Sequence, residues 1–205
     1  MTSNSPRALA PPGARATSTG RLSKRENASR CKLPRSMTRS LYVLRHAKAD
    51  ELAPAGGDRE RVLKRRGRKA AQAVGRFLTR LDEVPELVLC SSAARARETA
   101  ELAREAGAWD ATLELVDELY EARPADLRQA LARAESALER VMLVGHQPSL
   151  SLFIAELTGS EPDFPTGALA RLDLDAASWG EFGTRDAQLA WLVTPEILEA
   201  ARRRP

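Results

Sequence analysis

Each of the chain's two histidines directly follows a short apolar run. Arg45 and His46 come after the first of these runs, and His146 comes after a later one. A third apolar run, residues 87–90, is followed by two serines and then by Arg95. Apolar runs of this length are typical of buried strands, and ligands of open α/β sheets bind beyond the carboxyl ends of the strands. We therefore expect two imidazoles and at least two guanidinium groups to meet at one edge of a sheet.

These side chains suit one kind of chemistry. A guanidinium is always charged and matches phosphate oxygens bidentately, and a neutral imidazole is a nucleophile that can hold a covalent intermediate. Phosphoryl transfer depends mainly on positioning and on charge stabilisation. The glycine-rich loops GxxxxGK[ST] and GxGxxG, which bind nucleotides, do not occur in the sequence. The pattern predicts cleavage of a phosphate monoester or phosphoramidate through a phosphohistidine.

Three strings, LYVLRHAKAD, CSSAARARETA and VMLVGHQPSL, resemble motifs of the histidine phosphatase superfamily, also called phosphoglycerate-mutase-like. An Arg-His pair after the first strand is the signature of that superfamily. With DRERVLKRRG, LYEA and PTGALARLDL, the strings resemble its small phosphohistidine phosphatase branch over about residues 40–198. One departure is Ala47, which stands where many members of the superfamily have glycine.

The resemblance implies a role for each of four residues. His46 would accept the phosphoryl group, and Arg45 and Arg95 would clamp the phosphate. His146 would be a second phosphate ligand that also stabilises the transition state. The implied enzyme is a hydrolase that needs no metal and no other cofactor. Its substrate would be a protein carrying phosphohistidine or a small phosphate monoester.

The resemblance also implies a proton donor for the leaving group. The superfamily often carries this carboxylic acid in a Leu-x-Glu string, which places Glu121 in the role and leaves Glu118 as a nearby alternative. A phosphorylated imidazole is a better leaving group than an alcohol, so a phosphohistidine substrate needs less help from an acid. Asp58 and Arg61 are expected to shape the rim of the site at most.

Strand-like and helix-like segments alternate from residue 41 onward. Such alternation predicts an α/β three-layer sandwich, with a mainly parallel central sheet flanked by helices. For the second helix, Ser92 is the expected N-cap and Gly107 the expected stop. The expected strands are residues 41–45, 87–90, 113–116, 141–144, 168–174 and 189–193. The expected helices are residues 70–81, 93–106, 124–138 and 150–157, and one more after Pro195.

Residues 1–38 differ in composition from the rest of the chain. They are rich in Ser, Ala, Pro and Arg and lack apolar periodicity, so we expect a disordered basic extension before a phosphatase domain at 39–205. The extension resembles a transit peptide. The favoured explanation is instead that the start codon has been assigned too far upstream and that translation begins at Met37.

The net charge of +4 does not indicate a nucleic-acid partner, because residues 1–36 hold eight basic residues and one acidic residue. The remainder of the chain holds 24 basic and 27 acidic residues and is mildly acidic. No apolar run approaches the roughly 18 residues of a membrane span, so no membrane partner is expected. Two cysteines are too few for a disulfide framework, which fits a cytoplasmic location.

Three alternatives remain open from the sequence. A phosphomutase of the same superfamily would need insertions that close over its substrate, and the chain has little length for them. A non-catalytic phosphate-binding protein would use the same pocket without turnover. A metal site built on His46, His146 and Asp50 would lack compact ligand spacing, and neighbouring arginines would repel a divalent cation.

Overall fold

The computed structural model describes residues 38–52 and 57–202, which belong to one compact unit, Pro34–Pro205. The expected disordered extension lies outside the described residues except for its last residue, Thr38. That residue is instead the first residue of the first strand. Within the described ranges, no helix is long and apolar enough to cross a membrane.

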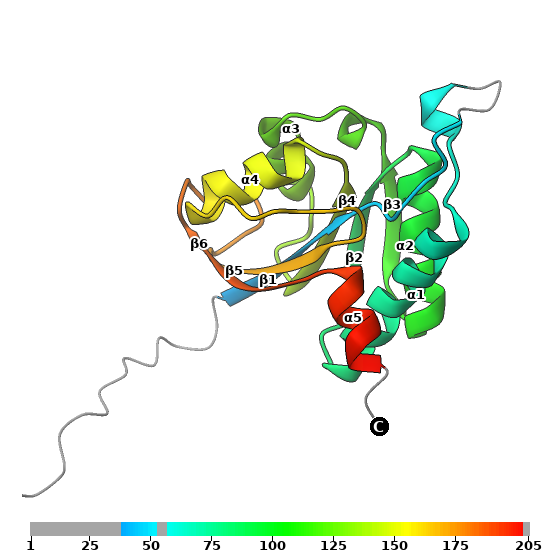
Figure 1. The fold of residues 1–205 in the computed structure, drawn as a ribbon. Coiled ribbons are helices and arrows are strands. Elements are labelled where there is room, and N and C mark those ends of the chain that lie inside the picture. The colour runs from blue at the N-terminus through cyan, green and yellow to red at the C-terminus, as the bar shows by residue number, and fades with distance from the viewer. Residues whose placement is uncertain (1–37, 53–56, 203–205) are drawn as a thin grey trace, which may run out of the picture. The chain divides into compact units, whose positions relative to one another are not determined.

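A single six-stranded sheet forms the centre of this unit (Figure 1). Its strands are β1 (Thr38–Arg45), β2 (Leu87–Ser91), β3 (Thr112–Val116), β4 (Arg140–Gly145), β5 (Leu169–Asp175) and β6 (Ala187–Val193). They lie in the order β3-β2-β4-β1-β5-β6. The first four strands of this order are parallel, whereas β5 is antiparallel to β1 and β6 is antiparallel to β5. The expected mainly parallel sheet is confirmed.

Helices cover both faces of the sheet, which confirms the three-layer sandwich. The α-helices are α1 (Arg65–Arg80), α2 (Ala94–Gly107), α3 (Pro124–Leu131), α4 (Ser149–Thr158) and α5 (Pro195–Arg202). Two short 3-10 helices, η1 (Asp58–Glu60) and η2 (Asp117–Leu119), lie in connecting segments. Buried side chains of α1, α2 and α5 pack on one face, and those of α3 and α4 pack on the other.

Alternation along β1 divides its side chains between the two cores. Leu41 and Val43 belong to the core under α3 and α4, while Tyr42 and Leu44 belong to the core under α1 and α2. All four are fully buried. Side chains of a strand point alternately to opposite faces, so a strand covered on both faces must be apolar throughout. This requirement explains the continuous apolar runs before both histidines.

Several helix boundaries differ from the expectation. α1 begins at Arg65 rather than at residue 70. α3 ends at Leu131 rather than at residue 138, because the following amides of Arg133 and Ala134 bond to carbonyls three residues back, and the chain turns. α2 has Ala93 rather than Ser92 as its N-cap residue, with no side-chain cap. The Ser92 hydroxyl instead donates a 2.5 Å hydrogen bond to Asp117.

Candidate active site

The parallel pairing of β1 with β4 brings the two histidines together. In this register Arg45 lies beside Gly145, so each histidine is the first residue after its strand. The main-chain N–H of His46 donates to the carbonyl of Gly145 at 3.0 Å. The centroids of the two imidazole rings are 5.0 Å apart, with their planes tilted by 50°. The expected convergence at one sheet edge is therefore present.

His46 is held in one tautomer and is neutral. Its Nδ1 lies 2.8 Å from the carbonyl oxygen of Ala47. A carbonyl only accepts, so Nδ1 carries the proton and Nε2 keeps its lone pair. Burial, together with the nearby charges of Arg95 and Arg45, lowers the pKa of His46 to about 4. At neutral pH the ring therefore has a free lone pair suited to nucleophilic attack.

His146 is neutral for similar reasons. Its Nε2 forms a 2.8 Å hydrogen bond with the hydroxyl of Ser91, the last residue of β2. Burial, and then the proximity of His46 and Arg95, lowers the pKa of His146 to about 3. The ring of Tyr120 packs edge-on against this imidazole, with centroids 5.7 Å apart. The second histidine is thus fixed in position by residues of two other segments.

Two guanidinium groups lie near the imidazoles. Arg95, in the first turn of α2, is only 6% exposed. Its charge lowers the pKa of both His46 and His146, so it lies close to both rings. Arg45 donates through Nη1 to the carbonyl of Phe164 at 2.9 Å, in the segment that precedes β5. The structure therefore brings together all four residues that the sequence places at the strand ends.

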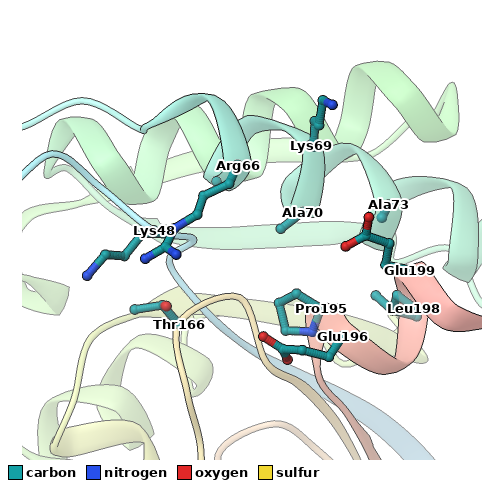
Figure 2. A pocket seen from close by; sticks show the side chains of 11 residues that line it. Lys48, Arg66, Lys69, Ala70, Ala73, Thr166, Pro195, Glu196, Leu198 and Glu199 are labelled. Carbon is teal, nitrogen blue, oxygen red and sulfur yellow. The ribbon is translucent and has the colours of Figure 1, made fainter.

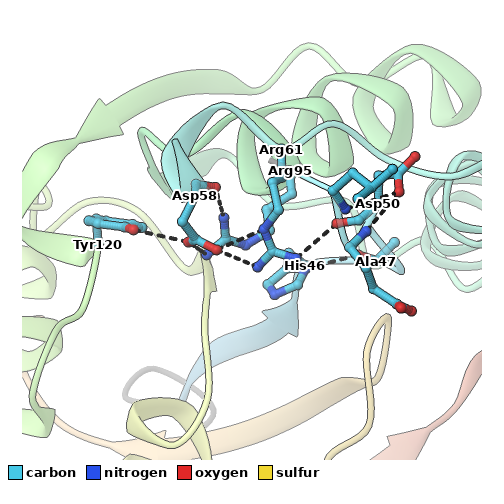
Figure 3. Close-up of polar contacts among 9 residues, drawn as sticks. His46, Ala47, Asp50, Asp58, Arg61, Arg95 and Tyr120 are labelled. Carbon is cyan, nitrogen blue, oxygen red and sulfur yellow. Dashed lines mark hydrogen bonds and ion pairs between the residues drawn. The ribbon is translucent and has the colours of Figure 1, made fainter. Parts of the chain in front are cut away.

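Asp58 occupies a more central place than the rim expected for it. It accepts hydrogen bonds from Arg61 at 2.7 Å and from the hydroxyl of Tyr120 at 3.0 Å (Figure 3). Arg95 contacts the Asp58 carboxylate at 3.0 Å and its carbonyl at 2.8 Å. Burial opposes ionisation of Asp58, but the hydrogen bond from Tyr120 and the charge of Arg95 outweigh it and lower the pKa of Asp58.

The segment that contains the expected acid turns a different side chain toward the site. Tyr120, which sequence reasoning did not single out, contacts Asp58 and His146. Glu121 has a positive φ of 55° and is exposed, although its charge is near enough to help raise the pKa of Tyr120 after burial and Asp58. Glu118 forms a 3.2 Å ion pair with Arg133 instead.

Ala47 fits at the position where many superfamily members have glycine. It is fully buried, and its N–H donates to the hydroxyl of Thr99 at 3.0 Å. Among the described residues, the non-glycine positions with positive φ are Asp82, Ala108, Glu121 and Arg185. The backbone at Ala47 thus needs no glycine, and the substitution leaves the segment after His46 unstrained.

The donor set around the histidines fits an oxyanion better than a metal ion. Within residues 38–52 and 57–202, no three His, Cys, Asp or Glu side chains are grouped to hold a metal. Asp50, the third ligand of the metal alternative, bonds instead to the amides of Glu51 and Leu52. Two buried guanidinium donors, Arg45 Nε and Arg95 Nε, have no hydrogen-bond partner in the same ranges, and neither has the ring nitrogen His146 Nδ1. Unpaired buried donors are costly, and a tetrahedral oxyanion offers several acceptors.

Comparison with known proteins agrees with this geometry. Residues 41–131 match the family described as histidine phosphatase superfamily (branch 1). An uncharacterized protein of Mycobacterium tuberculosis is 31% identical over 164 residues, which cover 74% of this chain and 99% of that protein.

Two solved structures of candidate phosphohistidine phosphatases named SixA are similar in fold and sequence. The protein from Nakamurella multipartitia is 26% identical with a TM-score of 0.69, and the match covers 77% of this chain and 96% of that one. The protein from Agrobacterium tumefaciens is 29% identical with a TM-score of 0.65, covering 77% and 98%. The motifs, the sheet order and these matches agree, and the chain belongs to the histidine phosphatase superfamily.

Proposed function

We propose that this protein hydrolyses phosphohistidine on a protein, or a small phosphate monoester, through a covalent phosphohistidine on His46. One observation carries the proposal: a neutral imidazole whose Nδ1 is bonded to Ala47 stands 5.0 Å, centroid to centroid, from a second buried imidazole, beside Arg95. This arrangement offers one nucleophilic lone pair surrounded by donors and positive charge, as phosphoryl transfer requires.

The reaction has two steps. In the first, His46 Nε2 attacks phosphorus, the bond from phosphorus to the substrate nitrogen or oxygen breaks, and the leaving group takes a proton. In the second, water attacks the phosphoryl group on His46, which releases inorganic phosphate and regenerates the imidazole. Arg45, Arg95 and His146 hold the phosphoryl oxygens in both steps, and Glu121 is the proposed proton donor.

Neutrality of the His46 imidazole supports its role as the nucleophile. A protonated His46 has no lone pair to attack phosphorus, and burial with Arg95 and Arg45 keeps the ring unprotonated well below neutral pH. Once the phosphoryl group is attached to His46, the positive charges of the same guanidinium groups stabilise its negative charge. No step needs a metal ion, so we propose a metal-independent hydrolase whose rate does not respond to chelators.

The remaining proposals concern location and partners. A cytoplasmic location is supported by the low cysteine count and by Cys90, which is a buried free thiol. A phosphorylated protein or small ester, rather than nucleic acid, is the proposed partner, since residues 37–205 carry a slight acidic excess.

The decisive experiment compares wild type with His46→Ala on a phosphohistidine protein and on p-nitrophenyl phosphate. We expect the variant to lose turnover of both, and mass spectrometry of alkali-quenched wild-type reactions to find the phosphoryl group on His46. Glu114→Gln, an exposed change in the middle of β3, is the control for differences in protein preparation. Full turnover by His46→Ala would rule out the proposed nucleophile.

A further inference from the structure

A cavity lined in part by Lys48, two residues after His46, contains none of the proposed catalytic residues. Its volume is about 510 Å³, and its walls come from α1, from α5, and from Lys48 and Thr166 (Figure 2). Ligand cavities in proteins measure about 300–1,000 Å³. The cavity is therefore large enough for a side chain and part of a main chain.

The two ends of the cavity differ in charge. Figure 2 shows Lys48, Arg66 and Thr166 at one end, with the guanidinium of Arg66 directed toward Lys48. Glu196 and Glu199 of α5 line the other end. The arrangement gives one end the donors that would hold a carboxylate.

The cations at this end are not neutralised equally. Lys48 lies 3.5 Å from Glu51, a carboxylate that it shares with Lys64. The side chain of Arg66, by contrast, takes part in no ion pair or hydrogen bond within the described ranges. An exposed guanidinium directed into a cavity, without a carboxylate of its own, is available to a carboxylate from outside.

Main chain separates this cavity from His46. The N–H of Gly167 donates to the carbonyls of Arg45 at 3.2 Å and His46 at 3.1 Å, so the segment of Thr166 is bonded to the nucleophile's own segment. On the other side, Gly67 of α1 packs so closely that an added Cβ would lie 2.2 Å from the Lys48 carbonyl oxygen. The main chain at Lys48 and at Gly167 thus forms a ridge between His46 and the cavity. A ligand that fills both sites must cross this ridge.

We propose that the cavity receives an acidic side chain that neighbours the phosphohistidine of a polypeptide substrate, with its carboxylate bound by Arg66 and Lys48. The inference rests on the proposed function and narrows its substrate class to polypeptides with an acidic residue near the phosphohistidine. A polypeptide is the favoured occupant because its continuous chain can cross the ridge while filling both sites.

The test compares two phosphohistidine peptides that differ only in Asp or Asn beside the phosphorylated residue. Arg66→Gln should raise KM for the Asp peptide about three- to fivefold, as expected for one exposed charge pair, with kcat and the Asn peptide unchanged. The matched control is Arg65→Gln, which removes the same charge from the same helical turn but does not line the cavity. Equal effects of the two variants, or of Arg66→Gln on the two peptides, would overturn the proposal.

A binding measurement separates this inference from the proposed function. Fluorescence anisotropy of labelled, unphosphorylated Asp and Asn peptides needs no turnover, and the Asp peptide should bind more tightly to wild type but not to Arg66→Gln. Absence of turnover with every phosphate substrate would contradict the proposed function while this difference still supports the cavity. If citrate binds to the cavity but the Asp and Asn peptides bind equally well, a polypeptide occupant is refuted.

Discussion

The hydrogen bond from His46 Nδ1 to the Ala47 carbonyl decides which ring nitrogen is available for attack. Because the acceptor is main chain, no rotation of a partner side chain can withdraw it. The segment that carries this carbonyl is itself fixed, since the Ala47 N–H donates to Thr99. The same α2 helix carries Thr99 and Arg95, whose side chain lies near both imidazoles. A shift of this helix would therefore disturb nucleophile and phosphate ligand together.

Arg95→Lys should weaken substrate binding although it keeps the positive charge. A lysine ammonium cannot reproduce the planar fork that matches two phosphate oxygens, so we expect KM for a phosphate monoester to rise about tenfold, a loss of about 1.4 kcal/mol. Steady-state kinetics provide the measurement. Arg97→Lys, on an exposed arginine of the same helix, is the control. An unchanged KM would show that Arg95 does not bind the phosphoryl group.

Glu121→Gln tests the proposed proton donor through its dependence on the leaving group. An alkyl phosphate releases an alkoxide that needs a proton, so kcat for this substrate should fall about 10²-fold, the lower end for general acid catalysis. Turnover of phosphohistidine should change little, because imidazole leaves more easily. Glu118→Gln, at the carboxylate paired with Arg133, should change neither rate. Equal losses on both substrates would argue against an acid role for Glu121.

Sequence reasoning locates the histidines and arginines because each has a strong local signal, an apolar strand that ends directly before it or a motif at a helix start. Asp58 and Tyr120 have no such signal. Asp58 reaches Arg95 through a 3-10 helix that no periodicity predicts, and Tyr120 faces the site because the chain turns at Glu121, where φ is 55°. Contacts that depend on loop geometry thus needed the structure.

At the level of elements, close packing of α1 positions the loop that follows the nucleophile. α1 begins at Arg65, five residues before the apolar periodicity that predicts it. Its first turn is basic, so hydrophobic spacing gives no indication of helix there. What holds this turn is contact with Lys48: the Lys64 N–H donates to the Lys48 carbonyl at 2.9 Å, and Gly67 packs against the same carbonyl.

Gly67→Ala and Gly75→Ala form a matched pair that separates stability from activity. An added Cβ would lie 2.2 Å from the Lys48 oxygen at Gly67 and 2.0 Å from the Ala103 oxygen at Gly75. Both variants should lose about 1–3 kcal/mol of unfolding free energy, as overpacked sites do. Gly67→Ala displaces the segment directly after His46, whereas Gly75→Ala presses on α2 at Ala103, about two turns beyond Arg95. Gly67→Ala should therefore lower kcat far more than Gly75→Ala does, at a temperature where both proteins are folded.

Urea unfolding and steady-state kinetics on the same samples make this comparison. Loss of kcat in Gly75→Ala equal to that in Gly67→Ala would show that general destabilisation explains both. The pair matters for the fold as a whole, because the contact between α1 and α2 at Gly75 uses main chain rather than side chains, and sequence patterns do not encode such contacts.

Across the whole molecule, the sheet order assembles the site from segments far apart in the chain. Pairing of β4 between β1 and β2 brings His46, His146 and Ser91 to one edge. Folding therefore buries two imidazoles beside guanidinium groups, an environment that the unfolded chain does not provide. The protein keeps both rings neutral, and this costs stability wherever the unfolded chain would protonate them.

Stability should consequently fall with acidification at a pH where most carboxylates are still ionised. The folded pKa values of His46 and His146 are about 4 and about 3, against the ordinary value of 6.5. Between 6.5 and about 4 the unfolded chain binds more protons than the folded one, so the free energy of unfolding decreases as pH falls, by at most about 1.4 kcal/mol per pH unit for each histidine. Above 6.5 this contribution is constant.

Urea unfolding at about pH 7.5 and about pH 5 measures the difference, and His146→Gln, which cannot titrate, should lose less stability between these two conditions than wild type. Carboxylates contribute equally to both proteins and cancel. An identical loss in the two proteins would mean that the fold does not hold His146 neutral.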